Sequence, residues 1–352
     1  MSAYKKFVEV CIRSTQSTHA IDDRTGMTSL FTSSKAYSAL PIAYSPDSHV
    51  GIPTGDIFVE GKLTGPHDRA CDTRAVIRAC IWHEKKAVTP YVQALFDHGN
   101  KFEPVAIAFF LKLFPHIEYH ESQRIVCEDP RWPWMGATPD GILYDHKAHR
   151  AYCLEVKTTG KRKLVHTEQP TVVHGDFAHD TNVRDPELNQ DVLVKDKKYP
   201  HVLLYRNTKI PDCYAMQFLL ECISTGIHDL LCVQFQAGTA YAPPVVCVTE
   251  YHFDHELFDI MQEYWSAVWR YVEEGRKHML KYKEEHARLE KEGMDTTYLA
   301  SNYQAWKANY PWPLREKGTP DSHCIRLMPN IFDKCRALKA KRDAEEMKAM
   351  AC

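Results

Sequence analysis

The sequence predicts an α/β protein, because short β-rich segments alternate with segments of helical periodicity. The predicted strands are rich in β-branched and aromatic residues and cover residues 117–127, 142–144, 152–158, 229–236 and 245–251. The predicted helices repeat apolar side chains every three or four residues and cover residues 1–13, 72–97, 104–114, 214–226 and 254–292. A chain of 352 residues, 44% of them hydrophobic, can build one large domain or two smaller ones.

Net charge and cysteine usage narrow the class of protein. Lys and Arg total 44 and Asp and Glu total 46, so the chain lacks the basic excess of a protein that coats nucleic acid, although a local basic groove remains compatible. The twelve cysteines include no Cys-x-x-Cys pair and no grouping that predicts zinc or an iron–sulfur cluster. Without a signal-peptide pattern or an apolar run of membrane-spanning length, we expect a soluble intracellular protein that contacts no membrane.

In the N-terminal part, residues 24–40 are rich in Ser and Thr, and residues 41–66 have the glycines and prolines of a loop. Ser33 or Ser34 is suited to cap a short helix that begins at Lys35. Capping alone accounts for either serine.

The helix predicted from Pro104 follows a glutamate. Proline suits the first turn of a helix, and Glu103 beside it would interact favourably with the helix dipole. Capping alone is therefore one interpretation of Glu103. His116 and His120 are four residues apart, but Pro115 and the strand pattern make this spacing a coincidence rather than a metal motif.

Residues 134–160 carry the strongest chemical pattern. Alternate side chains of a strand share one face, so Glu155 and Lys157 project together while Leu154 and Val156 face the core. Glu-x-Lys by itself is common on solvated strands. The spacing becomes informative only together with a second acidic residue nearby.

Asp140 supplies that second acidic residue. It lies in a Pro-Asp-Gly turn, which by itself is often only a turn. Polar residues 145–150 can reverse the chain, so a hairpin would bring Asp140 alongside Glu155. Two neighbouring carboxylates are hard oxygen ligands suited to Mg²⁺, which polarises a phosphate and acidifies a bound water. Lys157 beside that water can orient it, or transfer a proton if its pKa is lowered.

Two further regions carry weaker patterns. Residues 160–212 are polar and irregular apart from a predicted strand at 202–205, and a loop of this length is functional or an insertion. The basic triplet at 161–163 contacts phosphates or forms a solvated turn. Beyond the long helix, residues 297–352 form an appendage that ends in a charged helix from residue 334, which we expect to contact a partner.

The segments Gly136-Ala-Thr-Pro-Asp-Gly141 and Leu154-Glu-Val-Lys157 together resemble the PD-(D/E)xK nucleases. More narrowly, they resemble the branch of phage lambda exonuclease, the YqaJ-type viral recombinases and the alkaline nucleases of large DNA viruses. Two other motifs of that branch appear in the right order. Its Gly-x-x-x-Glu-x-x-Ala and Tyr-x-x-Gln patterns are matched by Gly99, Glu103, Ala106, Tyr214 and Gln217.

The resemblance implies a restriction-endonuclease-like core: a mixed central sheet flanked by helices, with helical N- and C-terminal additions. The implied segments are 1–70, with contacts to a DNA end; 71–275, the nuclease core with an insertion at about 160–212; and 276–352, a helical arm and appendage.

The resemblance also implies an activity. It predicts a Mg²⁺-dependent deoxyribonuclease, with Mn²⁺ as a substitute, that resects linear double-stranded DNA from 5′ to 3′ for viral-type recombination or genome processing. An endonuclease of the same superfamily, acting on DNA or RNA, is the alternative. The implied partners are double-stranded DNA ends and a single-strand annealing protein. Family members from phages form a homotrimer, whereas viral alkaline nucleases need not, so the resemblance allows a homotrimer but does not require it. A viral protein of this kind would act in the host nucleus or cytoplasm.

Site residues follow from the same resemblance. Asp140 and Glu155, with the Val156 carbonyl, would hold the metal; Lys157 would orient or activate water; and Glu103 and Gln217 would support them. The predicted DNA contacts are Arg24, Ser33 and Ser34 at the 5′-phosphate, and Lys161, Arg162 and Lys163 at the backbone. Arg24 lies further upstream than the family pattern has its arginine.

Overall fold

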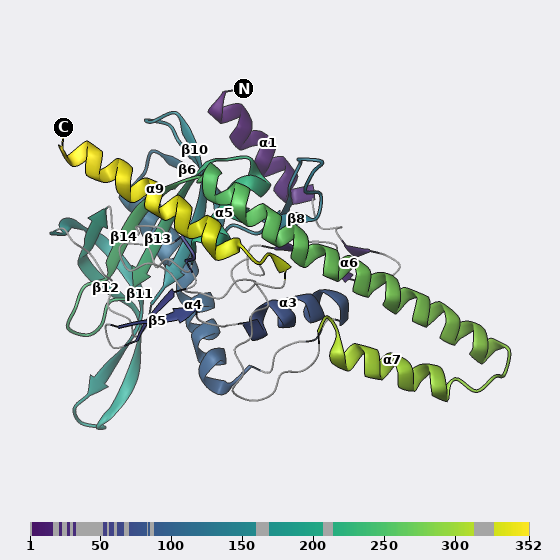
Figure 1. Cartoon of the computed structure of the whole chain (residues 1–352). Helices are drawn as coiled ribbons and strands as arrows, with labels where there is room; N and C mark the ends of the chain where they lie inside the picture. Colours follow the sequence, from purple (N-terminus) through teal and green to yellow (C-terminus); the bar gives the residue numbers. More distant parts are fainter. Residues whose placement is uncertain are drawn as a thin grey trace. The chain divides into compact units, whose positions relative to one another are not determined.

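A computed structural model describes residues 2–16, 21–22, 27–28, 31–32, 52–54, 56–59, 62–66, 70–82, 84, 88–159, 169–206, 214–312 and 327–351 (Figure 1). The chain forms two compact units. The first comprises Met1–Thr18, Ala87–Pro211 and Leu220–Phe253, and the second comprises His19–Lys86, Asp212–Leu219 and Asp254–Cys352.

The first unit is built on a seven-stranded sheet in the order β11-β12-β14-β13-β10-β9-β6. The bounds are β6 Ile117–His120, β9 Gly141–Asp145, β10 Arg150–Thr158, β11 Thr171–Asp185, β12 Gln190–Arg206, β13 Asp229–Gln236 and β14 Val245–His252. Strand β10 pairs with β13 in parallel and with β9 antiparallel. The predicted mixed sheet is therefore confirmed.

Helices cover both faces of this sheet. Helix α4 (Pro90–Leu113) packs on β10 and β13, and its apolar face shares a core with Leu143 and Leu154. Helix α1 (Ala3–Gln16) packs on β9 and β10, where the rings of Phe7 and Tyr144 lie 5.9 Å apart. Neighbouring residues of a strand face opposite sides, so α1 and α4 lie on opposite faces, as the predicted flanking helices require.

Helix α4 corrects the prediction for Glu103. The sequence suggested one helix at 72–97 and another from Pro104, whereas α3 (Ala70–Trp82) ends early and α4 runs through Pro104 without interruption. An interior proline removes one helical hydrogen bond, but burial of Ala106, Phe109 and Phe110 offsets this loss. Glu103 thus lies mid-helix, and the helix-dipole argument for it is wrong.

The segment predicted as a single strand at 117–127 is also corrected. Strand β6 ends at His120, and the polar residues 121–124 separate it from β7 (Ile125–Val126), which pairs with β8 (Met135–Ala137) outside the main sheet. This break lets Glu121 and Ser122 line a surface cleft instead of continuing the ladder.

The weakly patterned region 160–212 contains a long antiparallel hairpin. Strands β11 and β12 pair from Thr171↔Leu204 to Asp185↔Gln190, and the predicted strand at 202–205 is the end of β12 that pairs with β14. Sequence periodicity missed the rest because the distal residues 190–196 are exposed and show no apolar alternation of a half-buried strand.

The second unit is mainly helical. Its helices are α3, α6 (His255–Lys291), α7 (Thr297–Asn309) and α9 (Ile331–Ala351), and its short strands are β1 Ile21–Asp22, β2 Met27–Thr28, β3 Phe31–Thr32, β4 Asp56–Val59 and β5 Lys62–Pro66. Helix α6 packs against α3, α7 and α9. Its predicted apolar stripe is buried, including Leu257, Met261, Tyr264, Trp265, Val268 and Val272. None of the described helices is long and apolar enough to cross a membrane.

Helix α5 (Ala215–Thr225) contributes to both units and ends at Gly226, whose positive φ of 71° explains why glycine stands there. The charged helix predicted from residue 334 is part of α9. Several of its charges pair with α6: Lys334 with Glu263 at 2.6 Å, and Lys341 with Glu256 at 2.5 Å.

Two interactions at the start of α6 meet at Asp254. Its Oδ1 accepts a hydrogen bond from the Leu257 amide at 3.0 Å, and its two oxygens accept from Arg342 at 2.7 Å each. We expect Asp254→Ala to lower the free energy of unfolding by about 2 kcal/mol, because it removes both the cap and the ion pair. Asp254→Asn keeps a cap acceptor and should cost about half as much. Urea denaturation distinguishes the two, and equal losses would contradict this account.

Candidate functional site

The β9–β10 pairing fixes the position of Asp140. Its backbone N–H donates to the Leu154 carbonyl at 3.0 Å, and its Oδ2 accepts a hydrogen bond from the Val156 N–H at 2.6 Å. Gly141 pairs with Leu154 in the same register. The predicted hairpin is therefore present, and it holds the Asp140 carboxylate against the Val156 N–H of β10.

Glu155 and Lys157 share one face of β10, as alternation requires. The Lys157 ammonium donates to Glu155 Oε1, and Glu155 is only 3% exposed. Burial acts to lower the pKa of Lys157, but the negative charges of Glu155, Glu221 and Asp140 outweigh it and raise the pKa well above its ordinary value. Lys157 is therefore an ammonium ion in this arrangement, which suits it to orient a water or a phosphate oxygen.

Glu103 and Asp140 line the same cleft, which has a volume of about 480 Å³. Its wall combines apolar residues of α4 with polar residues that follow β6. The lining comprises Glu103, Pro104, Ile107, Ala108, Leu111, Tyr119, Glu121, Ser122, Thr138, Pro139 and Asp140. The cleft thus joins a mid-helix glutamate to the Pro-Asp turn, two segments 37 residues apart in the numbering of the chain.

The carboxylates are crowded electrostatically. Burial, followed by the charges of Glu155 and Glu103, raises the pKa of Asp140 well above its ordinary value. Burial and Glu155 likewise raise the pKa of Glu103. A carboxyl whose pKa is raised by folding stabilises the folded state below its unfolded pKa, and this contribution is lost as pH rises through the folded pKa. Near neutral pH, Asp140 and Glu103 therefore leave the fold less stable than it is at low pH, unless a cation compensates their charge.

This donor set fits a divalent metal ion. Carboxylate oxygens are the ligands that Mg²⁺ and Mn²⁺ prefer, and an excess of buried negative charge favours a cation over a neutral ligand. Asp140, Glu155 and the Val156 carbonyl are the groups that would hold it. Within the part of the chain that the structure describes, Lys157 is a positive charge that pairs with Glu155, and a metal ion would add to it.

Tyr119 holds the turn that presents Asp140. Its hydroxyl donates to the Asp140 carbonyl at 3.2 Å. Burial and the charges of Glu121, Asp140 and Glu103 raise the pKa of Tyr119 to about 12, so the hydroxyl stays a donor. Its ring also explains the glycine of the Pro-Asp-Gly turn, because a Cβ at Gly141 would collide with Tyr119 Cε2 and come within 3.0 Å of Cδ2.

Helix α5 adds a residue that sequence reasoning missed. Glu221 is fully buried, and its charge raises the pKa of Lys157. Gln217 precedes Glu221 by one helical turn and therefore lies on the same side of α5. Its supporting role stays a prediction. The sequence does carry a signal for Glu221, because it is an acidic residue in an otherwise apolar helix, four residues after Gln217. Tyr119 and Glu121 left no such signal, because only the fold brings them to the cleft.

The predicted DNA contacts lie outside the described residues. These are Arg24, Ser33, Ser34, Lys161, Arg162 and Lys163.

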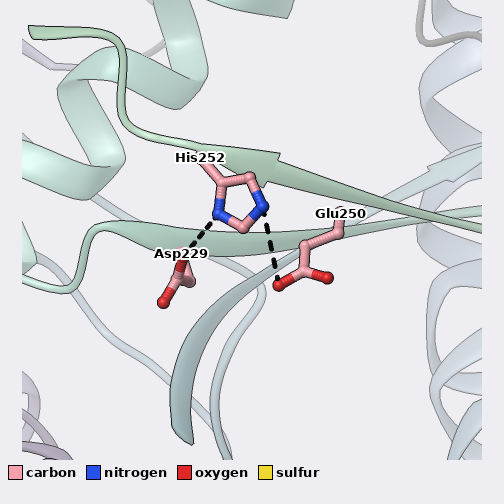
Figure 2. A group of neighbouring side chains, drawn as sticks. All are labelled: Asp229, Glu250 and His252. Carbon is pink, nitrogen blue, oxygen red and sulfur yellow. Dashed lines mark hydrogen bonds and ion pairs between the residues drawn. The ribbon is translucent and has the colours of Figure 1, made fainter.

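A second group of polar side chains lies at another place on the sheet. Asp229, Glu250 and His252 bring one potential ligand atom each within 4.8 Å of one another (Figure 2). His252 contacts Asp229 at 2.7 Å, but Arg150 already pairs with Asp229 at 2.8 Å and with Glu250 at 2.9 Å. Since the Arg150 guanidinium already pairs with both carboxylates, this group is better explained as a surface ion-pair network than as a metal site.

Comparisons with known proteins agree with the motifs. Residues 66–179, a segment that includes Glu103, Asp140, Glu155 and Lys157, match the family model of the YqaJ-like viral recombinase domain. The predicted resemblance is thereby confirmed. No curated protein sequence matches the chain.

Similar solved structures include a crystal structure of an alkaline exonuclease from Laribacter hongkongensis. It is 15% identical, with 74% of this chain and 95% of that chain covered and a TM-score of 0.40. A crystal structure of the same exonuclease, LHK-Exo, in complex with dAMP is 13% identical, with coverage of 76% and 96% and a TM-score of 0.39.

The contact between Gly141 and Tyr119 predicts that substitutions at these two positions have coupled effects on folding stability. Gly141→Ala should cost about 1–3 kcal/mol of folding free energy, because the new methyl group overlaps the tyrosine ring. In a Tyr119→Ala background the same change should cost at least about 1 kcal/mol less. Chemical denaturation of the four proteins of this cycle measures the coupling.

Gly99→Ala is a matched control for that cycle. Its Cβ would lie 4.0 Å from Thr158 Oγ1, and alanine favours the helix, so stability should not fall. Additive effects of Gly141→Ala and Tyr119→Ala would contradict the packing argument.

Proposed function

We propose that the protein is a divalent-metal-dependent deoxyribonuclease, and more narrowly a Mg²⁺-dependent 5′→3′ exonuclease that resects linear double-stranded DNA for viral-type recombination or genome processing. One observation carries the proposal. The register of β9 and β10 brings the Asp140 carboxylate beside Glu155 and Lys157, inside a segment that matches the YqaJ-like viral recombinase domain.

The proposed roles follow from the geometry. Asp140, Glu155 and the Val156 carbonyl hold the metal ion, which when bound polarises the scissile phosphate and acidifies a water. The Val156 N–H and the Tyr119 hydroxyl keep Asp140 and its turn in place. This fixed geometry is itself part of catalysis, because misplacement of a ligand by a fraction of an ångström weakens transition-state stabilisation.

Lys157 orients the attacking water or a phosphate oxygen. Its raised pKa, caused by Glu155, Glu221 and Asp140 against the opposing effect of burial, favours this role over proton abstraction. Glu103 lines the cleft next to Asp140 and supports the metal environment, and Gln217 supports the lysine. The proposal includes the 5′-phosphate contacts Arg24, Ser33 and Ser34 and the backbone contacts Lys161, Arg162 and Lys163.

The proposed substrate is a double-stranded DNA end. A single-strand annealing protein would bind the strand exposed by resection. A homotrimer would keep the enzyme bound to the DNA during successive cleavages. Both partners follow from the family resemblance alone. An endonuclease acting on DNA or RNA would use the same carboxylates and lysine, so only the products distinguish the two activities.

A cleavage assay tests the proposal. With Mg²⁺ and a linear duplex labelled at one 5′ end, the wild type should release the label as mononucleotide and leave a covalently closed circle intact. Lys157→Ala should reduce the rate by at least about a hundredfold, because it removes a group that acts on the reacting atoms. Lys147→Ala, an exposed lysine in the turn of the same hairpin, is the matched control and should cleave like the wild type.

The other products have definite meanings. Nicking or linearisation of the circle would support the endonuclease. Failure to cleave DNA by a protein that still binds the metal ion would exclude a deoxyribonuclease and make RNA the next substrate to test.

A further inference from the structure

The distal half of the β11–β12 hairpin leaves a strand edge accessible. Strand β12 begins at Gln190, yet its pairing with β14 begins only at Leu203, and no other described strand pairs with its outer edge before that point. The tip of this hairpin extends away from the sheet, at the bottom of Figure 1. Exposed backbone N–H and C=O groups along such an edge can accept a further strand.

Three of the exposed side chains on this edge strand are apolar. All residues from 190 to 196 are exposed, and Val192, Leu193 and Val194 have exposed fractions of 37%, 47% and 38%. Three consecutive large apolar side chains in water are costly, and they favour contact with another protein surface.

Charge restricts the kind of partner. The tip, residues 182–196, carries four acidic side chains and two basic ones: Asp185, Glu187, Asp191, Asp196, Arg184 and Lys195. Binding to the phosphate backbone requires a basic surface. An acidic tip is therefore better suited to a polypeptide than to a nucleic acid.

The sequence of the edge is complementary to itself. Residues 191–195 read Asp-Val-Leu-Val-Lys. If two copies pair antiparallel about a two-fold axis at Leu193, each Asp191 faces Lys195 of the other copy, and each Val192 faces Val194. Every cross-strand pair is then apolar with apolar or of opposite charge, and pairs of these kinds stabilise antiparallel sheets.

We propose that this edge of β12 docks a second copy of the chain, forming a two-fold antiparallel β12–β12 contact centred on Leu193. The contact joins two hairpins into a four-stranded ribbon in the order β11-β12-β12-β11. It is isologous, so it closes at a dimer and does not propagate. Its area is small, and the association is therefore weak and dependent on concentration.

Charged residues on a free edge also serve to prevent strand addition. When the added strand belongs to a second copy of the same chain, charged residues prevent pairing only if like charges face each other across the two strands. Here the residues that would meet, Asp191 and Lys195, have opposite signs. Within its own hairpin Asp191 lies 3.6 Å from Arg184, but its side chain remains 62% exposed and accessible to a second strand.

Charge reversal tests the dimer directly. By sedimentation velocity over a range of concentrations, the full-length wild type should show a reversible association through β12, whether the associating species is a monomer or the homotrimer of the proposed function. Asp191→Lys and Lys195→Asp should each weaken it by at least about tenfold, because like charges then meet twice in every dimer. The double variant Asp191→Lys/Lys195→Asp should recover most of the affinity, since it restores both opposite-charge pairs.

Two further variants complete the design. Leu193→Asp places two like charges on the two-fold axis and should abolish the dimer, while Lys147→Asp on the β9–β10 turn should leave it unchanged. Circular dichroism and thermal melting check that each variant is folded, as substitutions at exposed positions should be.

Several results would overturn the proposal. These are a wild type that stays monomeric at every concentration, an association that none of the hairpin variants weakens, and a folded double reversal that recovers nothing. A homotrimer needs a surface other than this two-fold contact, so a trimer that shows no further association sensitive to these substitutions would also overturn the proposal. The test involves neither nuclease activity nor the metal site, so its outcome is independent of the proposed function.

Discussion

The repulsion among the buried Glu155 and the half-buried Asp140 and Glu103 is the constraint on which the site depends. Asp140 cannot move away from Glu155, because the β9–β10 register and the Val156 N–H hold it in place. Burial and the neighbouring charges therefore raise the pKa of Asp140 and of Glu103. Lys157 neutralises only part of this charge. A fold that keeps these acidic groups close together favours the binding of a cation.

The scaffold around these residues keeps them in position. One face of β10 contributes Leu154 and Val156 to the core beneath α4, so the opposite face must present Glu155 and Lys157. The uninterrupted helix α4 brings Glu103 to the cleft. Rigid strands and a packed helix define ligand positions better than loops do, and burial supplies the low dielectric that strengthens each charge interaction.

Sequence reasoning found the parts of this site that local patterns encode. Alternation along β10 and the turn at Asp140 predicted the hairpin correctly, and strand β13 and helix α6 fell close to their observed bounds. Predictions failed where long-range packing decides. Buried apolar contacts let α4 continue through Pro104, and β11–β12 pairing formed a long hairpin from segments without apolar alternation. The position of Tyr119 against Gly141 is likewise a property of the folded sheet.

The most direct test of this account is the thermal stability of the wild type and Asp140→Asn, each in EDTA and in Mg²⁺ near neutral pH. Asparagine keeps an acceptor for the Val156 N–H but removes one buried charge. The account predicts that the variant melts several degrees higher than the wild type in EDTA, equivalent to about 1–2 kcal/mol, and gains less from Mg²⁺. A wild type that is the more stable protein in EDTA, or that gains nothing from Mg²⁺, would contradict it.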